Sequence, residues 1–273
     1  MRNAHVQHRS HIRRPAPLPA AARWLLPTLL LFAMCTPARA APTAEEVLQR
    51  ALAGMGGAAA VDGVRTLIVA SETTRREEGK VLTLPTTTYF QYPNSVRKEL
   101  VLEGKRLALV STNRGAVMVT PEGNFDLPED GRLAIELPAL RNPVSLLKAR
   151  NAPKVSFTYK GAAKVGERPV DLLEMRVGPH LMTLGIDTAN GRLLRQTYWT
   201  NPGYENQYEM EITFSDFREI GNGLVYPFAW RAENQGKLVS ESMTTSVGVN
   251  EILDPAMFPA PLKAGAAGAA AGR

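Results

Sequence analysis

The chain is poor in the residues from which many active sites are built. Its single cysteine, Cys35, lies in the first forty residues, as do three of its four histidines. Residues 41–273 therefore have no thiol for a disulfide or for thiol chemistry, and only one imidazole, that of His180. Zinc peptidases need paired histidines and a carboxylate, so this class is excluded.

Motifs for phosphate binding and for serine hydrolysis are also missing. No GxGxxG or GxxxxGK[ST] loop follows a strand pattern, and no Gly-x-Ser-x-Gly elbow precedes a helix pattern. His180 ends Val177-Gly178-Pro179-His180, a sequence typical of a turn, and we interpret it as a solvated turn residue. We therefore expect no catalytic residue, no metal site and no cofactor, and predict that the protein is not an enzyme. A pair of glycosidase-type carboxylates stays open, because 26 Asp and Glu residues are present and no pair stands out.

Residues 1–40 have the organisation of a secretory signal peptide. A basic stretch precedes an apolar run from Trp24 to Met34, and Ala38-Arg39-Ala40 offers the small residues of a cleavage site. The run is much shorter than the roughly twenty residues that span a bilayer, so stable membrane insertion is not expected. Lipidation of Cys35 is disfavoured by the bulky Met34 before it. We predict cleavage before Ala41 and a location in the periplasm.

The basic character of the chain belongs to this leader. The sequence has 32 Lys and Arg against 26 Asp and Glu, and its pI is about 9.5. Six arginines and no carboxylate lie in residues 1–40, which accounts for the whole excess. Residues 41–273 are formally neutral, so no nucleic-acid partner is predicted.

Residues 41–259 are predicted to form one domain that begins with a helix. Thr43 and Glu46 make a capping box before an amphipathic pattern, and Gly56-Gly57 ends it. Residues 260–273 are low-complexity Ala and Gly, for which we predict a disordered tail.

From Val64 onward the hydrophobic period changes from 3.6 to 2. Turn signals such as Asn113-Arg114-Gly115 and Asn190-Gly191 separate short runs, and connections of this length cannot join parallel strands. The sequence therefore predicts an antiparallel sheet, with strands at about residues 64–72, 86–92, 95–103, 105–111, 116–121, 154–160, 169–177, 181–187, 193–200, 208–217, 224–231 and 238–249.

The segment from Gly131 to Arg150 interrupts the strands. Pro138 and Pro143 divide its apolar residues, which favours two short helical pieces over one rod. Such pieces bury little area and open at low cost, so the segment is either a cap on the core or a movable lid. The predicted lid residues are Leu133, Leu137, Leu140 and Leu146.

The last strands have one apolar and one polar face. A sheet of this kind must cover its apolar face, and the chain has few helical residues with which to do so. We therefore predict an apolar cleft for a ligand, while an alternative is that the same side chains fill a closed core. The predicted ligand-binding residues are Phe157, Tyr159, Leu173, Met175, Tyr208, Met210, Ile212, Phe214, Tyr226, Phe228 and Trp230.

Two stretches resemble the periplasmic lipoprotein-sorting (LolA-like) family, the superfamily of outer-membrane lipoprotein carriers. Ile186-Asp187-x-x-x-Gly191 followed by Leu193–Tyr198 resembles a hairpin of that family. Phe214–Arg218 with Gly221-x-Gly223-Leu224-Val225-Tyr226-Pro227 resembles the strand pair after it. The resemblance covers most of residues 44–258. It implies a mainly β fold of the α+β class: an open antiparallel half-barrel of about eleven strands with an N-terminal helix and a helical lid, whose concave face holds acyl chains.

The predicted function is that of a soluble periplasmic carrier in outer-membrane biogenesis, which binds a lipid or a lipoprotein acyl chain in the apolar cleft. Burying a chain of roughly sixteen carbons contributes on the order of 12 kcal/mol before entropic costs, and micromolar binding needs about 8 kcal/mol. The alternative is an envelope protein-interaction module with a filled core and no lipid cargo. A hydrolase that uses Asp216 or Glu174 is a third possibility.

Overall fold

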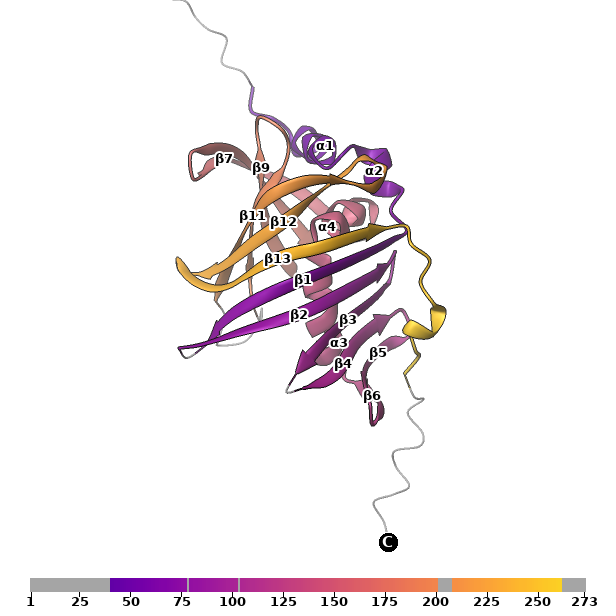
Figure 1. Ribbon diagram of the computed structural model, residues 1–273. Helices are drawn as coiled ribbons and strands as arrows, with labels where there is room; N and C mark the ends of the chain where they lie inside the picture. The colour runs from indigo at the N-terminus through magenta and orange to yellow at the C-terminus, as the bar shows by residue number, and fades with distance from the viewer. Residues whose placement is uncertain (1–39, 78, 103, 201–207, 262–273) are drawn as a thin grey trace, which may run out of the picture. The chain divides into compact units, whose positions relative to one another are not determined.

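The computed structural model describes residues 40–77, 79–102, 104–200 and 208–261. The predicted leader and most of the predicted tail lie outside these residues. Within them, thirteen strands form one antiparallel sheet in the order β6-β5-β4-β3-β2-β1-β13-β12-β11-β10-β9-β8-β7 (Figure 1). β6 and β7 are its edges, so the sheet is open, and the predicted fold class is confirmed with thirteen strands where about eleven were expected.

All of these elements belong to one unit of the chain, Ala41–Arg273. The helices are α1 (Ala44–Gly54), α2 (Ala58–Asp62), α3 (Glu129–Leu140) and α4 (Pro143–Lys148), with short 3-10 turns η1 (Ala149–Asn151), η2 (Gly221–Gly223) and η3 (Pro255–Met257). The strands are β1 (Thr66–Glu77), β2 (Lys80–Gln91), β3 (Ser95–Leu102), β4 (Lys105–Thr112), β5 (Gly115–Thr120), β6 (Gly123–Leu127), β7 (Val155–Val165), β8 (Arg168–Val177), β9 (His180–Asp187), β10 (Leu193–Trp199), β11 (Glu209–Ile220), β12 (Leu224–Asn234) and β13 (Lys237–Val249).

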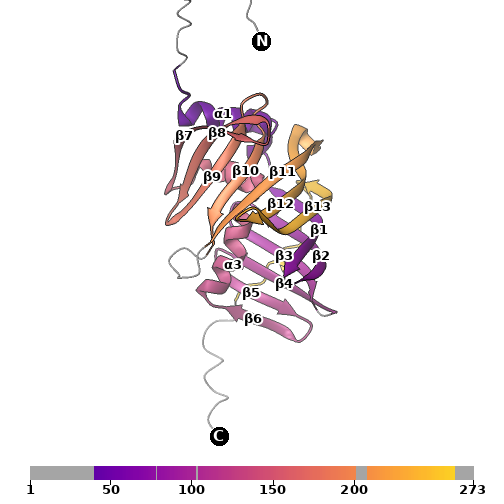
Figure 2. The same cartoon turned by 90° about the vertical axis from the view of Figure 1, so that its left-hand side faces the viewer.

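The sheet consists of two meanders that meet at one long-range strand pair. Strands β1–β6 form the N-terminal arm and strands β7–β13 form the C-terminal arm, and each strand pairs with its neighbours in the chain. β1 and β13 join the arms, with Leu67 opposite Val249. Figure 2 shows the two arms as successive sets of strands, with α3 beside β4 and β5.

Two parts of the sheet differ from the sequence prediction. β1 and β2 form a long hairpin in which Arg75 lies opposite Leu82, although residues 73–85 were given no strand. Residues 73–80 of this hairpin, Thr-Thr-Arg-Arg-Glu-Glu-Gly-Lys, include no apolar side chain, so this part shows no apolar alternation. β6 was also missed, because its alternation of Phe125 and Leu127 with Asn124 and Asp126 extends over only five residues.

α1 covers the C-terminal arm at the end where β7, β8 and β9 lie. The predicted capping box is present: the Glu46 amide donates to Thr43 Oγ1 at 3.2 Å, and the Thr43 amide donates to Glu46 Oε2 at 2.7 Å. Gly54, at the end of α1, lies against the backbone of Gly191, where a Cβ atom would be 2.3 Å from the Gly191 carbonyl carbon. This close approach brings the apolar face of α1 onto the sheet, and it buries Val47, Leu48, Ala51 and Leu52.

The proline-interrupted segment forms α3 and α4, which differ in burial. In α4 the five residues from Pro143 to Leu147 are all buried, whereas Ile135 is the one buried residue of α3. Asn142 caps α4 by accepting from the Val144 amide at 3.0 Å, and its Nδ2 donates to the Tyr226 hydroxyl at 2.8 Å. α4 is therefore part of the core, and α3 lies over the N-terminal arm, against β3–β6.

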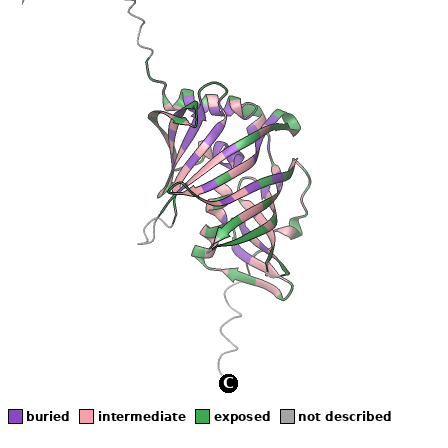
Figure 3. Cartoon of the chain, turned by 60° about the vertical axis from the view of Figure 1, so that its left-hand side comes forward, coloured by how far each residue is buried: buried purple, intermediate pink, exposed green. Residues whose placement is uncertain are grey.

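Buried residues are concentrated between the helices and the C-terminal arm, while the N-terminal arm has more exposed positions toward its hairpin tips (Figure 3). The opposite face of the N-terminal arm has a small cluster of its own. There Phe258 packs on Ala108, Val110 and Val117. Among the described residues, no helix is long and apolar enough to cross a bilayer.

Candidate functional site

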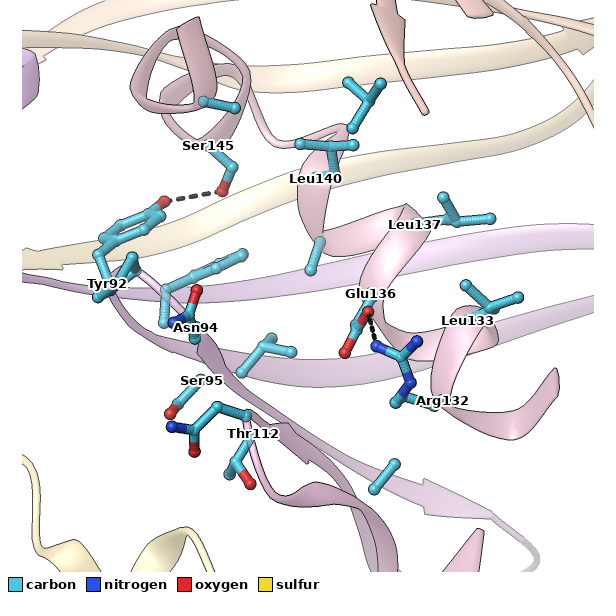
Figure 4. A pocket seen from close by; sticks show the side chains of 18 of the residues that line it. Tyr92, Asn94, Ser95, Thr112, Arg132, Leu133, Glu136, Leu137, Leu140 and Ser145 are labelled. Atoms are coloured by element: carbon cyan, nitrogen blue, oxygen red, sulfur yellow. Dashed lines mark hydrogen bonds and ion pairs between the residues drawn. The ribbon is translucent and has the colours of Figure 1, made fainter. Parts of the chain in front are cut away.

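A large cavity lies between α3 and the ends of strands β2–β5. Its volume is about 1050 Å³, at the upper end of the roughly 300–1,000 Å³ typical of small-molecule sites. α3 and α4 form one wall, and the turns at residues 92–95 and 112–115 form another (Figure 4). These turns lie at the same end of the strands, because alternate turns of an antiparallel meander fall at the same end.

The cavity is lined by both apolar and polar residues. Its polar lining residues include Asn94, Ser95, Thr112 and Asn113 from the two turns. Figure 4 shows Asn94, Ser95 and Thr112 on the side across from α3. The apolar lining residues are Phe90, Val96, Ala116, Leu127, Leu133, Leu137, Ala139, Leu140, Ala149, Ala152 and Val177. This composition suits a ligand that is mostly apolar.

α3 is held over the cavity by polar contacts. Glu136 accepts from Ser111 Oγ of β4 at 2.7 Å and from Arg132 Nη1 at 2.6 Å. Arg132 also donates to Glu129, and this hydrogen bond holds the pKa of the Glu129 carboxyl below its usual range. Of these contacts, the Ser111–Glu136 hydrogen bond joins α3 to the sheet.

Tyr92 and two residues of α4, Ser145 and Lys148, line another part of the cavity. The Tyr92 hydroxyl is 2.8 Å from Ser145 Oγ, and burial raises the pKa of Tyr92 above its ordinary value. Lys148 Nζ lies 5.0 Å from the centre of the Tyr92 ring and donates to the carbonyls of Val61 and Asp62. Burial lowers the pKa of Lys148. This part of the cavity is therefore fixed by contacts with the core.

A second, smaller cavity of about 140 Å³ lies at the C-terminal end of α3. Leu137 and His180 line both cavities, so the two are adjacent. Arg141 lies in the smaller one, with its guanidinium carbon 3.5 Å from the centre of the Tyr198 ring. Burial, and then the charge of Arg141, lower the pKa of His180. His180 was expected to be a solvated turn residue, and it instead lies half-buried between the cavities.

The predicted ligand-binding residues lie elsewhere, on the C-terminal arm. None of them lines either of these two cavities. Tyr208 is 41 % exposed. The others are buried or half-buried: Leu173, Met175, Met210, Phe214, Tyr226 and Phe228 are buried, and Phe157, Tyr159, Ile212 and Trp230 pack against the main core. The contact of these residues with a ligand stays a prediction.

The predicted lid residues divide between cavity and core. Leu133, Leu137 and Leu140 of α3 line the larger cavity, whereas Leu146 of α4 is 1 % exposed and belongs to the core. Sequence reasoning identified the turn at Asn113-Arg114-Gly115 but assigned neither turn of the opposite wall to a ligand site. The order of the strands could have indicated this wall, because it places the turns after β2 and β4 at the same end of the sheet.

Neither a family model nor a curated protein sequence matches the chain. Several solved structures, in contrast, are similar to the chain. A DUF1329 family protein from Desulfovibrio piger matches with a TM-score of 0.56 and 14% identity, over 79% of this chain and 97% of that one. A LolA superfamily protein from Nitrosomonas europaea matches with a TM-score of 0.53 and 14% identity, over 80% and 98% of the two chains. The fold is LolA-like. A domain from Vibrio parahaemolyticus described as an outer membrane lipoprotein-sorting protein shares this LolA-like fold, with a TM-score of 0.53 and 14% identity over 79% and 97%.

Proposed function

We propose that the protein is a periplasmic carrier that holds an acyl chain of a lipid or lipoprotein in the larger cavity. The supporting observation is the cavity itself: about 1050 Å³, with three half-buried leucines of α3 along one wall. A bound chain of roughly sixteen carbons would contribute on the order of 12 kcal/mol before entropic costs, which is ample for micromolar affinity. The signal-like first forty residues support export.

α3 is the movable lid of this proposal, and α4 is not. A chain can enter the cavity when α3 separates from β4. Because Ile135 is the one buried residue of α3, this separation exposes little apolar surface. The same movement of α4 would expose five buried residues and break the hydrogen bond from Asn142 to Tyr226.

The test is uptake of a fluorescent fatty acid by the purified protein and by two matched variants. Ala139 of α3 lines the cavity and Ala134 of the same helix is exposed. Ala139→Trp should fill the hollow and weaken binding at least about tenfold, while Ala134→Trp should bind like the wild type. The carrier proposal fails if the wild type takes up no fatty acid and native mass spectrometry finds no lipid on protein isolated from the periplasm. It also fails if Ala139→Trp binds as tightly as Ala134→Trp.

One observation favours the second candidate, an envelope protein-interaction module. The concave residues of the C-terminal arm are packed against α1 and the core, as this alternative expects. Cross-linking in the periplasm that traps one abundant protein, together with no fatty-acid uptake, would favour the module over the carrier.

A further inference from the structure

The charges around the two cavities are unevenly paired. Four cationic side chains line them: Arg114, Arg132, Arg141 and Lys148. The lining carboxylates are those of Glu129 and Glu136, and both are paired with Arg132. Within the described ranges, the other three cations form no salt bridge, although the Asp62 carboxylate interacts electrostatically with Lys148.

Arg141 differs from the other two in how its charge is stabilised. Arg114 is exposed and donates to the Phe258 carbonyl at 3.1 Å, and Lys148 donates to two carbonyls at the end of α2. The guanidinium of Arg141 is half-buried and stacks on the Tyr198 ring. A guanidinium has five N–H donors, and burial of a charge without a counter-ion is costly. Consistent with this cost, burial lowers the pKa of Arg141.

The surroundings of Arg141 suit an anion attached to an apolar chain. Leu181, Met182 and Trp199 give the small cavity apolar surface beside Arg141, of which Met182 is buried and Leu181 and Trp199 are exposed. The His180 imidazole offers one more hydrogen-bond donor, even in its neutral form. A chain that passes Leu137 from this cavity enters the larger one, because Leu137 lines both.

We propose that the small cavity at Arg141 binds the oxyanion head group, a carboxylate or phosphate, of an amphiphile whose acyl chain occupies the larger cavity. This inference rests on the carrier function proposed above and names its ligand class. The head group forms a charge-assisted hydrogen bond with Arg141, an interaction stronger than one between neutral groups. It also ties the C-terminal end of α3 to the strand ends that hold His180 and Tyr198.

The test compares ligands that have one chain and different head groups. Palmitic acid, hexadecanol and palmitoyl lysophosphatidic acid are each titrated against the purified protein by displacement of a bound fluorescent probe. The wild type should bind at least one of the two anions about tenfold more tightly than the alcohol. The anion that shows the larger preference identifies the carboxylate or the phosphate as the natural chemistry.

Three variants test whether the preference for an anionic head group depends on Arg141. Arg141→Gln should remove it while leaving the affinity for hexadecanol unchanged, and Arg141→Lys should retain part of it because the charge remains. Arg106→Gln removes an exposed cation of β4 that lines neither cavity, and it should change neither affinity. Equal binding of anions and alcohol by the wild type overturns the head-group site and leaves the carrier function standing. An equal loss of anion and alcohol affinity in Arg141→Gln, with circular dichroism unchanged, overturns it as well. Failure of all three ligands to bind contradicts the carrier function and the head-group site together.

Discussion

The two arms of the sheet are built from the same antiparallel strand pattern but are covered by different kinds of helix. α1 lies on the C-terminal arm with four buried residues among its eleven, and α4 adds five more to the core. α3 lies over the N-terminal arm with one buried residue among its twelve. The apolar residues of α1 and α4 fill the space beneath these helices, whereas Leu133, Leu137 and Leu140 of α3 face a cavity and stay half-buried. The cover, rather than the sheet, therefore decides where a ligand has room.

The largest effect is expected in the filled arm. Leu173 of β8 is 0 % exposed, so Leu173→Ala should lower the free energy of unfolding by about 2–5 kcal/mol, through lost burial and a new cavity. Urea denaturation followed by circular dichroism measures this loss. A loss below about 1 kcal/mol would show that the C-terminal arm is hollow too, and the contrast between the arms would be wrong.

Substitutions of one glycine in α1 and one in α3 test whether the two helices differ in how tightly they pack on the sheet. Gly54→Ala places a Cβ atom against the backbone of Gly191, which should cost about 1–3 kcal/mol in unfolding free energy. Gly131→Ala in α3 meets the Leu127 Cβ atom at 3.0 Å, a side-chain contact that α3 can relieve by shifting over the hollow. Its gain in helix propensity should offset that contact, giving a change near zero. Thermal unfolding of the two variants measures both changes in stability. Equal losses of stability in Gly54→Ala and Gly131→Ala would contradict the contrast between α1 and α3.

Substitutions of two serines, each of which makes a hydrogen bond that holds a helix in place, distinguish the proposed lid α3 from the core helix α4. Ser111→Ala removes the hydrogen bond to Glu136 of α3, and Ser145→Ala removes that between α4 and Tyr92. Each should cost about 1 kcal/mol of stability. Hydrogen exchange followed by mass spectrometry should show faster exchange throughout α3 in Ser111→Ala alone. Unchanged exchange of α3 in that variant would rule out the Ser111–Glu136 bond as the contact that holds the lid.

Only a small loss of stability is expected for a substitution of Leu137. This side chain is half-buried beside an existing hollow, so Leu137→Ala should cost less than about 1 kcal/mol in unfolding free energy. Binding of palmitic acid should nevertheless weaken severalfold, because Leu137 lines the proposed path of the chain. Leu102→Ala, at a position 45% exposed on β3, is the control and should leave binding unchanged. A Leu137→Ala variant with wild-type affinity would place the chain elsewhere.

Sequence reasoning located the elements well where the pattern was strong. The capping box at Thr43, the period-2 strands and the proline break at Pro143 all appear in the structure. It could not assign the cavity, because period-2 alternation identifies the face of a residue and not what covers that face. Phe214 and Phe228 face inward as expected, but they are buried at 6 % and 8 % exposure.

By itself, the sequence determined the antiparallel meander, the capped first helix and the interrupted helical segment, because these depend on local turn chemistry and hydrophobic period. The tertiary structure alone decided that α1 and α4 fill one region while α3 spans a hollow, and that Arg141, Tyr198 and His180 meet beside it. The physical reason is that packing depends on which side chains approach across long sequence separations. Local periodicity carries no information about which residues meet across such separations.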